Sequence, residues 1–237
     1  TSGAHVTNIG LCHTPLVYFA FATGKFDLGI MVTGSHNPKD HNGFKIIDKD
    51  STFFGAQIRK IFERIRSQAF VDGSGREILI NTTMRDYVKR IFHDLDIFGN
   101  INIAWDVGNG ATSEVVRKIV KLLPGHHIVL NPEIDGNFPG RSPDPTNNEN
   151  LSDLIKLVKD ECMDLGFAFD GDADRLLAVD EKGEVVDGDK MIALLALDMK
   201  KREKLHANTC VVTQMTNLGF FRWAKENGIV VSTSAKI

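Results

Sequence analysis

Thr33-Gly34-Ser35-His36-Asn37-Pro38 directly follows a short apolar run at residues 28–32. The run predicts a buried β-strand, because it is continuous and is bounded by turn residues. Glycine, asparagine and proline around Ser35 favour a rigid turn that holds the serine at the tip of this strand. On this pattern alone, a well-capped turn is as good an interpretation as a serine that carries or accepts a chemical group.

A lysine and a histidine near Ser35 are candidate acids or bases. Lys45 ends a second glycine turn, Asn42-Gly43-Phe44-Lys45, and is the better candidate, because an ammonium group both neutralises phosphate charge and exchanges protons. His36 is the auxiliary candidate, since it directly follows the serine. The serine-hydrolase pattern Gly-x-Ser-x-Gly is absent, because Asn37 occupies its last position.

Three aspartates alternate with small residues in a second segment, Asp170-Gly171-Asp172-Ala173-Asp174-Arg175. Carboxylates this close repel one another unless a cation is present, and their oxygens are hard ligands for a divalent cation. Arg175 adds a guanidinium group that suits a phosphate. The pattern favours a catalytic magnesium site.

Two alternatives for this acidic segment carry less weight. An EF-hand calcium loop requires glycine where Arg175 stands, and it requires flanking helices where the apolar runs 165–169 and 176–179 predict strands. A solvated acidic turn without a ligand is the other alternative.

A glycine turn at residues 106–110 admits a dinucleotide site or a purely structural turn. The full pattern Gly-x-Gly-x-x-Gly is missing, because Ser113 stands where the third glycine should be. A structural connection between a strand and a helix is therefore the favoured interpretation.

Composition excludes several classes of protein. The 237 residues carry a formal net charge of −3, so neither a nucleic-acid partner nor a disordered acidic tract is indicated. The three cysteines are far apart, which argues against a disulfide framework and favours the cytoplasm. No apolar run approaches the length of a membrane span, and no signal peptide precedes the first motif. Because the sequence lacks an initial methionine and ends on a barely finished strand, we expect a fragment of a longer protein.

Strands and helices are expected to alternate from end to end. Residues 101–130 predict a strand, a glycine turn, a helix and a strand, which is a βαβ unit. Residues 71–83 are polar and resemble a linker or the end of a domain, and residues 131–150 form a long loop rich in proline and glycine. The fold class is therefore α/β, with successive three-layer α/β domains and mixed, mainly parallel sheets.

Taken together, the serine segment, the lysine turn and the acidic segment resemble the α-D-phosphohexomutase family, the bacterial-type phosphomannomutases and phosphoglucomutases. The turn at 106–113 and the loop at 138–145 resemble that family as well. The resemblance implies three parts: residues 1–83 as the second portion of domain I, 84–186 as domain II, and 187–237 as the start of domain III. It implies an isomerase of carbohydrate metabolism that interconverts hexose 6-phosphates and hexose 1-phosphates of mannose or glucose.

The resemblance also implies roles for individual residues. Ser35 matches the serine that is phosphorylated in the resting enzyme. Asp170, Asp172 and Asp174 match the ligands of one Mg²⁺ ion, and a phosphoserine oxygen at Ser35 completes the site. A glucose or mannose 1,6-bisphosphate is the implied intermediate and activator, and it returns its other phosphate to the serine after turning around.

The remaining candidates complete this picture. Arg175 is the implied phosphate-binding residue, and Lys45 and His36 are the implied general acid or base. Hexose phosphates are the implied partners, with no nucleic acid, no membrane and no particular oligomeric state.

Parts of the family pattern are missing from this sequence. The first loop of domain I, the sugar-selecting loop of domain III and the whole of domain IV have no counterpart, so we expect the chain alone to be inactive. Two other functions stay open. One is a non-catalytic remnant that binds a phosphosugar or a metal, and the other is an aspartyl-phosphate hydrolase with Asp170 as nucleophile and Asp172 as acid.

Overall fold

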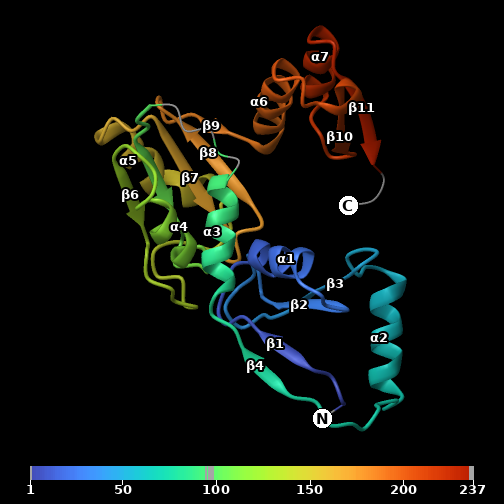
Figure 1. Ribbon diagram of the computed structural model, residues 1–237. Helices are drawn as coiled ribbons and strands as arrows, with labels where there is room; N and C mark the ends of the chain where they lie inside the picture. Colours follow the sequence, from blue (N-terminus) through green and yellow to red (C-terminus); the bar gives the residue numbers. More distant parts are fainter. Residues whose placement is uncertain (1, 94, 96–98, 235–237) are drawn as a thin grey trace.

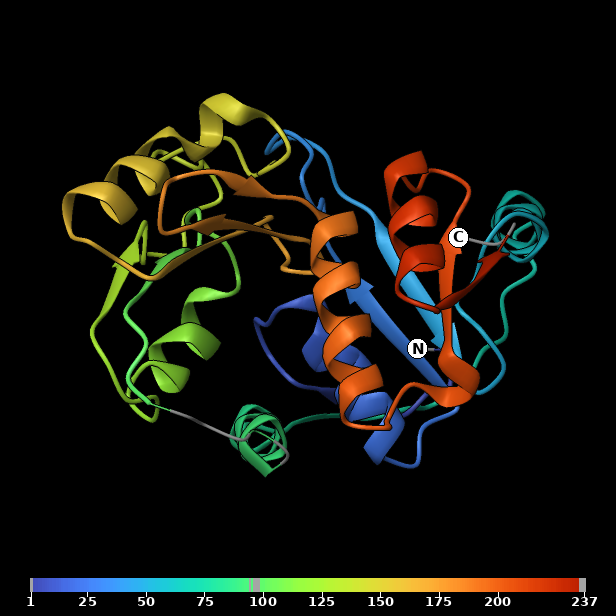
Figure 2. The same ribbon diagram turned by 90° about the horizontal axis from the view of Figure 1, so that it is seen from above.

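The computed structural model describes residues 2–93, 95 and 99–234. The chain forms an N-terminal, a central and a C-terminal part, each built from helices and small sheets (Figure 1). In the view from above, the central part lies on the opposite side from helix α2 (Ala56–Arg66) and the C-terminal part (Figure 2). Parallel and antiparallel pairings occur together, and the predicted α/β class with mixed sheets is confirmed.

The N-terminal part contains two small sheets. One pairs β1 with β4 in parallel, and the other pairs β2 with β3 in antiparallel orientation. Helix α1 packs on one face of β2, where Leu16, Val17 and Met31 form a small core. The elements other than α2 are β1 (Val6–Asn8), α1 (Thr14–Thr23), β2 (Leu28–Val32), β3 (Phe44–Asp48) and β4 (Glu77–Leu79).

Strand β2 exists as predicted, but the expectation that it is buried is wrong. Leu28, Ile30 and Val32 are 45, 51 and 55% exposed, whereas Met31 is 9% exposed. Alternate residues of a strand point to opposite faces of the sheet, and the described residues cover only the face that meets α1. The continuous apolar run therefore indicated a strand covered on both faces, whereas the described residues cover one face.

Residues 71–83, which the sequence suggested were a linker or the end of a domain, contain strand β4. Backbone hydrogen bonds extend the pairing with β1 beyond both ends of β4. Val6 N donates to Arg76 O at 2.9 Å, and Ile80 N donates to Asn8 O at 2.8 Å. A strand of three exposed residues is too short to show a periodic pattern, and its partner lies about 70 positions earlier in the chain. This pairing depends on tertiary structure and leaves little trace in local sequence.

The central part is a five-stranded sheet in the order β6-β5-β7-β8-β9. The first three strands are parallel, and β8 and β9 add antiparallel pairs at one edge. Its elements are α3 (Thr83–His93), β5 (Ile103–Asp106), α4 (Ser113–Ile119), β6 (His127–Leu130), the 3-10 helix η1 (Asn148–Leu151), α5 (Ser152–Asp160), β7 (Leu165–Phe169), β8 (Leu176–Asp180) and β9 (Val185–Val186).

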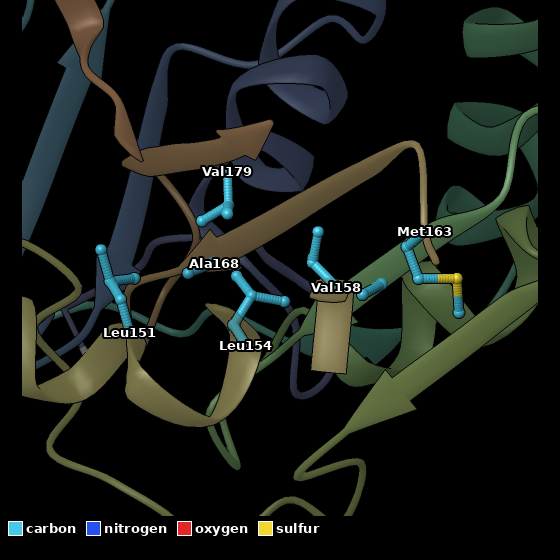
Figure 3. Packing of buried hydrophobic residues seen from close by; sticks show 7 residues of the cluster. Leu151, Leu154, Val158, Met163, Ala168 and Val179 are labelled. Atoms are coloured by element: carbon cyan, nitrogen blue, oxygen red, sulfur yellow. The ribbon is translucent and has the colours of Figure 1, made fainter. Parts of the chain in front are cut away.

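Helices cover both faces of this sheet. Successive side chains of β5 point to opposite faces, and all of them are buried. Ala104 belongs to the core under α5, whereas Ile103 and Trp105 belong to the core under α3 and α4. Figure 3 shows the α5 side, where the labelled side chains are Leu151, Leu154, Val158, Met163, Ala168 and Val179.

A glycine in β7 brings helix α5 close to the sheet. A Cβ atom at Gly166 would lie 2.9 Å from a methyl group of Val158 and 3.1 Å from one of Leu154. The helix therefore packs directly on the backbone of the strand that ends at the acidic segment.

The C-terminal part pairs β10 with β11 in parallel and packs α6 and α7 on them around Ala196, Val212, Phe220 and Ala224. Among the described residues, no helix is both long and apolar enough to cross a membrane. The elements are α6 (Gly188–Lys201), the 3-10 helix η2 (His206–Asn208), β10 (Thr209–Thr213), α7 (Leu218–Glu226) and β11 (Val230–Ser234).

His13, the residue before α1, is a buried histidine between the N-terminal and central parts. It is 2% exposed, and its ring packs on Tyr87 of α3 with centroids 5.1 Å apart. Neither ring nitrogen has a hydrogen-bond partner among the described residues. Burial lowers the pKa of His13 to about 4.

We expect Leu154→Ala to destabilise the protein by about 2 to 5 kcal/mol, because it removes a fully buried side chain between α5 and β7. Urea unfolding followed by circular dichroism measures the change. Leu122→Ala is the matched control, since Leu122 is 57% exposed in the same part, and it should cost less than about 0.5 kcal/mol. Equal losses for both variants would contradict the packing described here.

His13 should make stability depend on pH. Its folded pKa lies below the unfolded value of about 6.5, so the unfolded chain binds more protons, and stability falls as pH drops from about 6.5 towards 4. We expect this residue to account for roughly 2 to 3 kcal/mol of the loss between pH 7.5 and 4.5. Urea unfolding at both pH values should give a smaller loss for His13→Phe than for the unchanged protein, and identical losses would contradict the assignment.

Candidate active site

Two loops that lie far apart in the sequence meet where the N-terminal and central parts touch. The serine loop, residues 33–38, follows β2, and the acidic loop, residues 170–175, connects β7 to β8. Ser35 Oγ donates towards Asp170 Oδ2 at 3.0 Å and Asp172 Oδ1 at 3.1 Å. A Cβ atom on Gly171 would clash with the carbonyl oxygen of Ser35, so the two backbones are in direct contact.

The serine loop is held in a tight conformation by its own small and polar residues. Ser35 has a φ of 54°, which a residue with a side chain rarely adopts, and its N–H donates to Thr33 Oγ1 at 2.8 Å. Gly34 is required for space, because a Cβ atom there would lie 2.8 Å from the carbonyl oxygen of His41. Asn37 donates from both its backbone and its side chain to Gly34 O at 2.9 Å. The turn is therefore rigid and aims the hydroxyl of Ser35 at the acidic loop.

The acidic loop gathers three carboxylates at one point. Strands β7 and β8 are antiparallel, and Ala173 at φ 56° lets the connection curl within a few residues. One carboxylate oxygen from each of Asp170, Asp172 and Asp174 lies within 4.8 Å of the others. Asp170 and Asp172 are buried, so their mutual repulsion is weakly screened.

Lys45 and the first turn of α1 compensate the charge of Asp172. Lys45 Nζ donates to Asp172 Oδ2 at 2.6 Å and also to Asp174. Burial alone would raise the pKa of Asp172, but the hydrogen bonds from Lys45 and Thr14 outweigh it, so this pKa is lowered. The pKa of Lys45 is raised, because its bonds to the two aspartates outweigh the opposite effect of burial.

Asp170 is compensated less completely. Burial and the neighbouring charge of Asp172 raise its pKa, although Arg175 donates to it from the backbone at 3.1 Å and from Nη2 at 3.0 Å. Arg175 also lies 3.9 Å from a carboxylate oxygen of Asp144 in the long loop. The Arg175 side chain is 36% exposed and shares Asp170 Oδ2 with the Ser35 hydroxyl, so it lies where it can meet a phosphate on the serine.

Sequence reasoning missed the role of Thr14. A Thr-Pro pair at the start of a helix is usually read as a cap, but His13 is the N-cap and Thr14 lies inside the first turn. Thr14 Oγ1 donates to Asp172 Oδ2 at 2.7 Å, and Thr14 N donates to Asp172 O at 2.8 Å. The partial positive charge at the start of α1 therefore faces an acidic residue of another part of the chain.

All residues proposed from the sequence for this site lie together in the structure. His36 Nδ1 is 3.3 Å from Ser35 Oγ, and Lys45 donates to Asp172, one of the two carboxylates that Ser35 reaches. Besides Thr14, sequence reasoning missed Asp144, which contacts Arg175 from a loop about 30 positions away. The sequence pointed to Asp144 only as part of a long, polar loop, of which residues 138–145 share in the family resemblance.

The glycine turn at residues 106–110 connects β5 to α4 and is filled by side chains. The Asp106 carboxylate accepts from Gly108 N at 2.9 Å and from Asn131 at 3.0 Å, and Arg141 covers Gly108. This arrangement agrees with the structural interpretation of the turn. The acidic loop is flanked by strands, which also disfavours an EF-hand.

The possible metal ligands of the acidic loop fit a hard divalent cation. It offers converging carboxylate oxygens and no soft ligand, and Asp170 stays incompletely compensated by the cationic side chains around it. Ser35 Oγ points at the same oxygens, so a group carried on it would lie beside the cation.

Comparison with known proteins gives matches along nearly the whole chain. Residues 1–72, 85–183 and 187–235 match, in order, domains I, II and III of "Phosphoglucomutase/phosphomannomutase, alpha/beta/alpha". The "Phosphomannomutase/phosphoglucomutase" of Pseudomonas syringae pv. tomato is 42% identical over 201 residues, which are 85% of this chain and 43% of that protein. The "Phosphoglucosamine mutase" of Clostridioides difficile is 37% identical and covers 98% of this chain and 53% of its own length.

Solved structures agree with these matches. A phosphoglucomutase/phosphomannomutase family protein from Burkholderia thailandensis superimposes with a TM-score of 0.89 at 32% identity, over 98% of this chain and 52% of that one. The chain spans about half the length of the relatives it matches. Three consecutive domain matches, in the family's order, leave one conclusion: the chain belongs to the phosphoglucomutase/phosphomannomutase family.

Proposed function

We propose that the protein is a phosphohexomutase, which interconverts hexose 6-phosphates and hexose 1-phosphates through a phosphoserine and a bisphosphorylated sugar. The observation that carries the proposal is the approach of Ser35 Oγ to Asp170 and Asp172, at 3.0 and 3.1 Å, across 135 and 137 positions of sequence. Among the described residues, the Ser35 hydroxyl lies beside a cluster of carboxylates that can hold a divalent cation. It suits a phosphoryl group that a divalent cation neutralises.

Glucose and mannose phosphates are the proposed substrates, with glucose or mannose 1,6-bisphosphate as intermediate and activator. The similar protein from Pseudomonas syringae is named for both sugars. We assign turnover to the whole protein, because this chain covers 43% of that relative. For the chain alone we propose no turnover, since positioning of the sugar supplies much of the rate of phosphoryl transfer.

In the proposed reaction Ser35 carries the phosphoryl group on Oγ. A sugar hydroxyl attacks the phosphorus, the bond from phosphorus to Oγ breaks, and a new bond to the sugar oxygen forms. The sugar then turns around, and its other phosphate returns to Oγ. Arg175 holds phosphate oxygens. Lys45 is the general acid or base: the attacking sugar hydroxyl gives up its proton through Lys45, and the Ser35 oxygen released from phosphorus takes one up. His36, whose Nδ1 lies 3.3 Å from Ser35 Oγ, assists at the serine.

Asp170, Asp172 and Asp174 would hold one Mg²⁺ together with an oxygen of the phosphoserine. When bound, the cation withdraws charge from the phosphoryl group. Thr14 and Arg175 fix Asp172 and Asp170 through hydrogen bonds of 2.7 and 3.0 Å, so these carboxylates need little reorganisation to serve as ligands.

An aspartyl-phosphate hydrolase is the less favoured alternative. Its nucleophile would be Asp170, which is fully buried and already accepts bonds from Ser35 and Arg175. A non-catalytic remnant that binds a phosphosugar or a metal would share the metal site, and an isomerisation assay on the whole protein separates it from the mutase.

We expect the protein to gain one phosphoryl group on Ser35 when incubated with glucose 1,6-bisphosphate and Mg²⁺. Intact-protein and peptide mass spectrometry locate the group. Ser35→Ala should stay unmodified, because the accepting oxygen is gone, whereas Ser67→Ala should be modified like the unchanged protein, since Ser67 is an exposed serine at the C-cap of α2. A phosphate on any other residue, or none on the whole protein, would sink the proposal.

Asp172→Asn should weaken Mg²⁺ binding and slow transfer to Ser35 on the order of 100-fold, because one anionic ligand is lost. Chelation of Mg²⁺ should abolish transfer in the unchanged protein. Asp160→Asn, which changes the same charge at an exposed position on α5, is the control and should leave both unaffected. Transfer that persists in full after chelation would contradict the metal site.

A further inference from the structure

Arg141 is a buried arginine that none of the roles above uses. It lies in the long loop between β6 and η1, and its side chain is 6% exposed. Its guanidinium pairs through Nε with the carboxylate of Asp106, which is 1% exposed. A buried ion pair of this kind persists only where its geometry and hydrogen bonds are well satisfied.

The other donors of Arg141 bind backbone at the ends of two neighbouring strands. Nη2 donates to Phe169 O at 2.7 Å and to Asp106 O at 3.3 Å, and Nη1 donates to Ser142 O at 3.0 Å. Asp106 ends β5 and Phe169 ends β7, which pair in parallel. Carbonyl groups at the ends of strands lose their ladder partners, and one planar guanidinium supplies donors to both.

These two strand ends border the acidic loop. Phe169 directly precedes Asp170 in the chain, so the bond to its carbonyl oxygen fixes the entry of the loop. Asp106 begins the turn that leads to Ala111, whose N–H donates a hydrogen bond to Gly171 O at 3.0 Å. This bond fixes the backbone of the acidic loop one residue after Asp170. Gly108 leaves space for the guanidinium, because a Cβ atom there would lie 2.8 Å from Arg141 Cζ.

We propose that Arg141 is a positioning residue for the metal site: it joins the ends of β5 and β7 and thereby sets the acidic loop for a divalent cation. This inference rests on the proposed metal-binding role of that loop. Arg141 touches neither the carboxylates of the acidic loop nor Ser35, so it acts through the backbone. The fork of the guanidinium is required, because a lysine ammonium cannot span two carbonyl oxygens and a carboxylate in one plane.

The test is a titration of the full chain with Mn²⁺ alone, followed by electron paramagnetic resonance of the free ion. Arg141→Lys, which keeps the charge, should weaken Mn²⁺ binding by about 10- to 100-fold, as is typical when a residue that orients the metal ligands is lost. Arg117→Lys is the matched control. Arg117 also holds the long loop, through Pro132 O at 2.8 Å, but does not reach the acidic loop, so its replacement should change affinity by less than about twofold.

A second variant keeps the test decisive if Arg141→Lys fails to fold. Gly108→Ala retains the arginine but pushes its guanidinium aside, and it should weaken Mn²⁺ binding by at least about threefold. Normal affinity in a folded Arg141→Lys protein, or in Gly108→Ala if the first does not fold, would overturn the inference and leave the metal site standing. Absence of Mn²⁺ binding in the unchanged protein, with Asp172→Asn no different, would instead refute the proposed function.

Discussion

The repulsion between two buried carboxylates, Asp170 and Asp172, is the constraint on which this structure depends. Burial in a medium that screens poorly makes such a pair costly unless cationic or donor groups surround it. The chain brings these groups from separate elements: Lys45 from β3, Thr14 from α1 and Arg175 from the loop itself. This requirement and the packing of His13 on Tyr87 both hold the N-terminal and central parts in contact.

Much of the fold could be predicted from sequence, because the signals were local. The alternation of apolar runs and glycine turns gave the α/β class, and Ser35 and the three aspartates stood out by their residue types and spacing. The exposure of β2 could not be predicted, because an apolar run shows that a strand can be covered but not what covers it. Strand β4 was too short for any pattern and is defined by its partner β1.

Within the site, the residues that sequence reasoning missed share one property. Thr14 and Asp144 have ordinary local explanations, a helix start and a polar loop, and their contacts with Asp172 and Arg175 arise only from tertiary structure. Arg141 is of the same kind, since nothing in a proline-rich loop indicates that its side chain reaches two strand ends. Chemistry-bearing residues are visible in sequence, whereas the residues that orient them are visible only once the chain is folded.

The bond between Thr14 and Asp172 has a consequence for the junction between the two parts. Asp172 completes the start of helix α1 and is at the same time a candidate cation ligand. By thermodynamic linkage, any event that changes the charge around Asp172 changes the free energy of contact between the N-terminal and central parts. This contact in turn changes the affinity of the acidic loop for a cation. Asp172 therefore couples the electrostatic state of the site to the contact between the N-terminal and central parts.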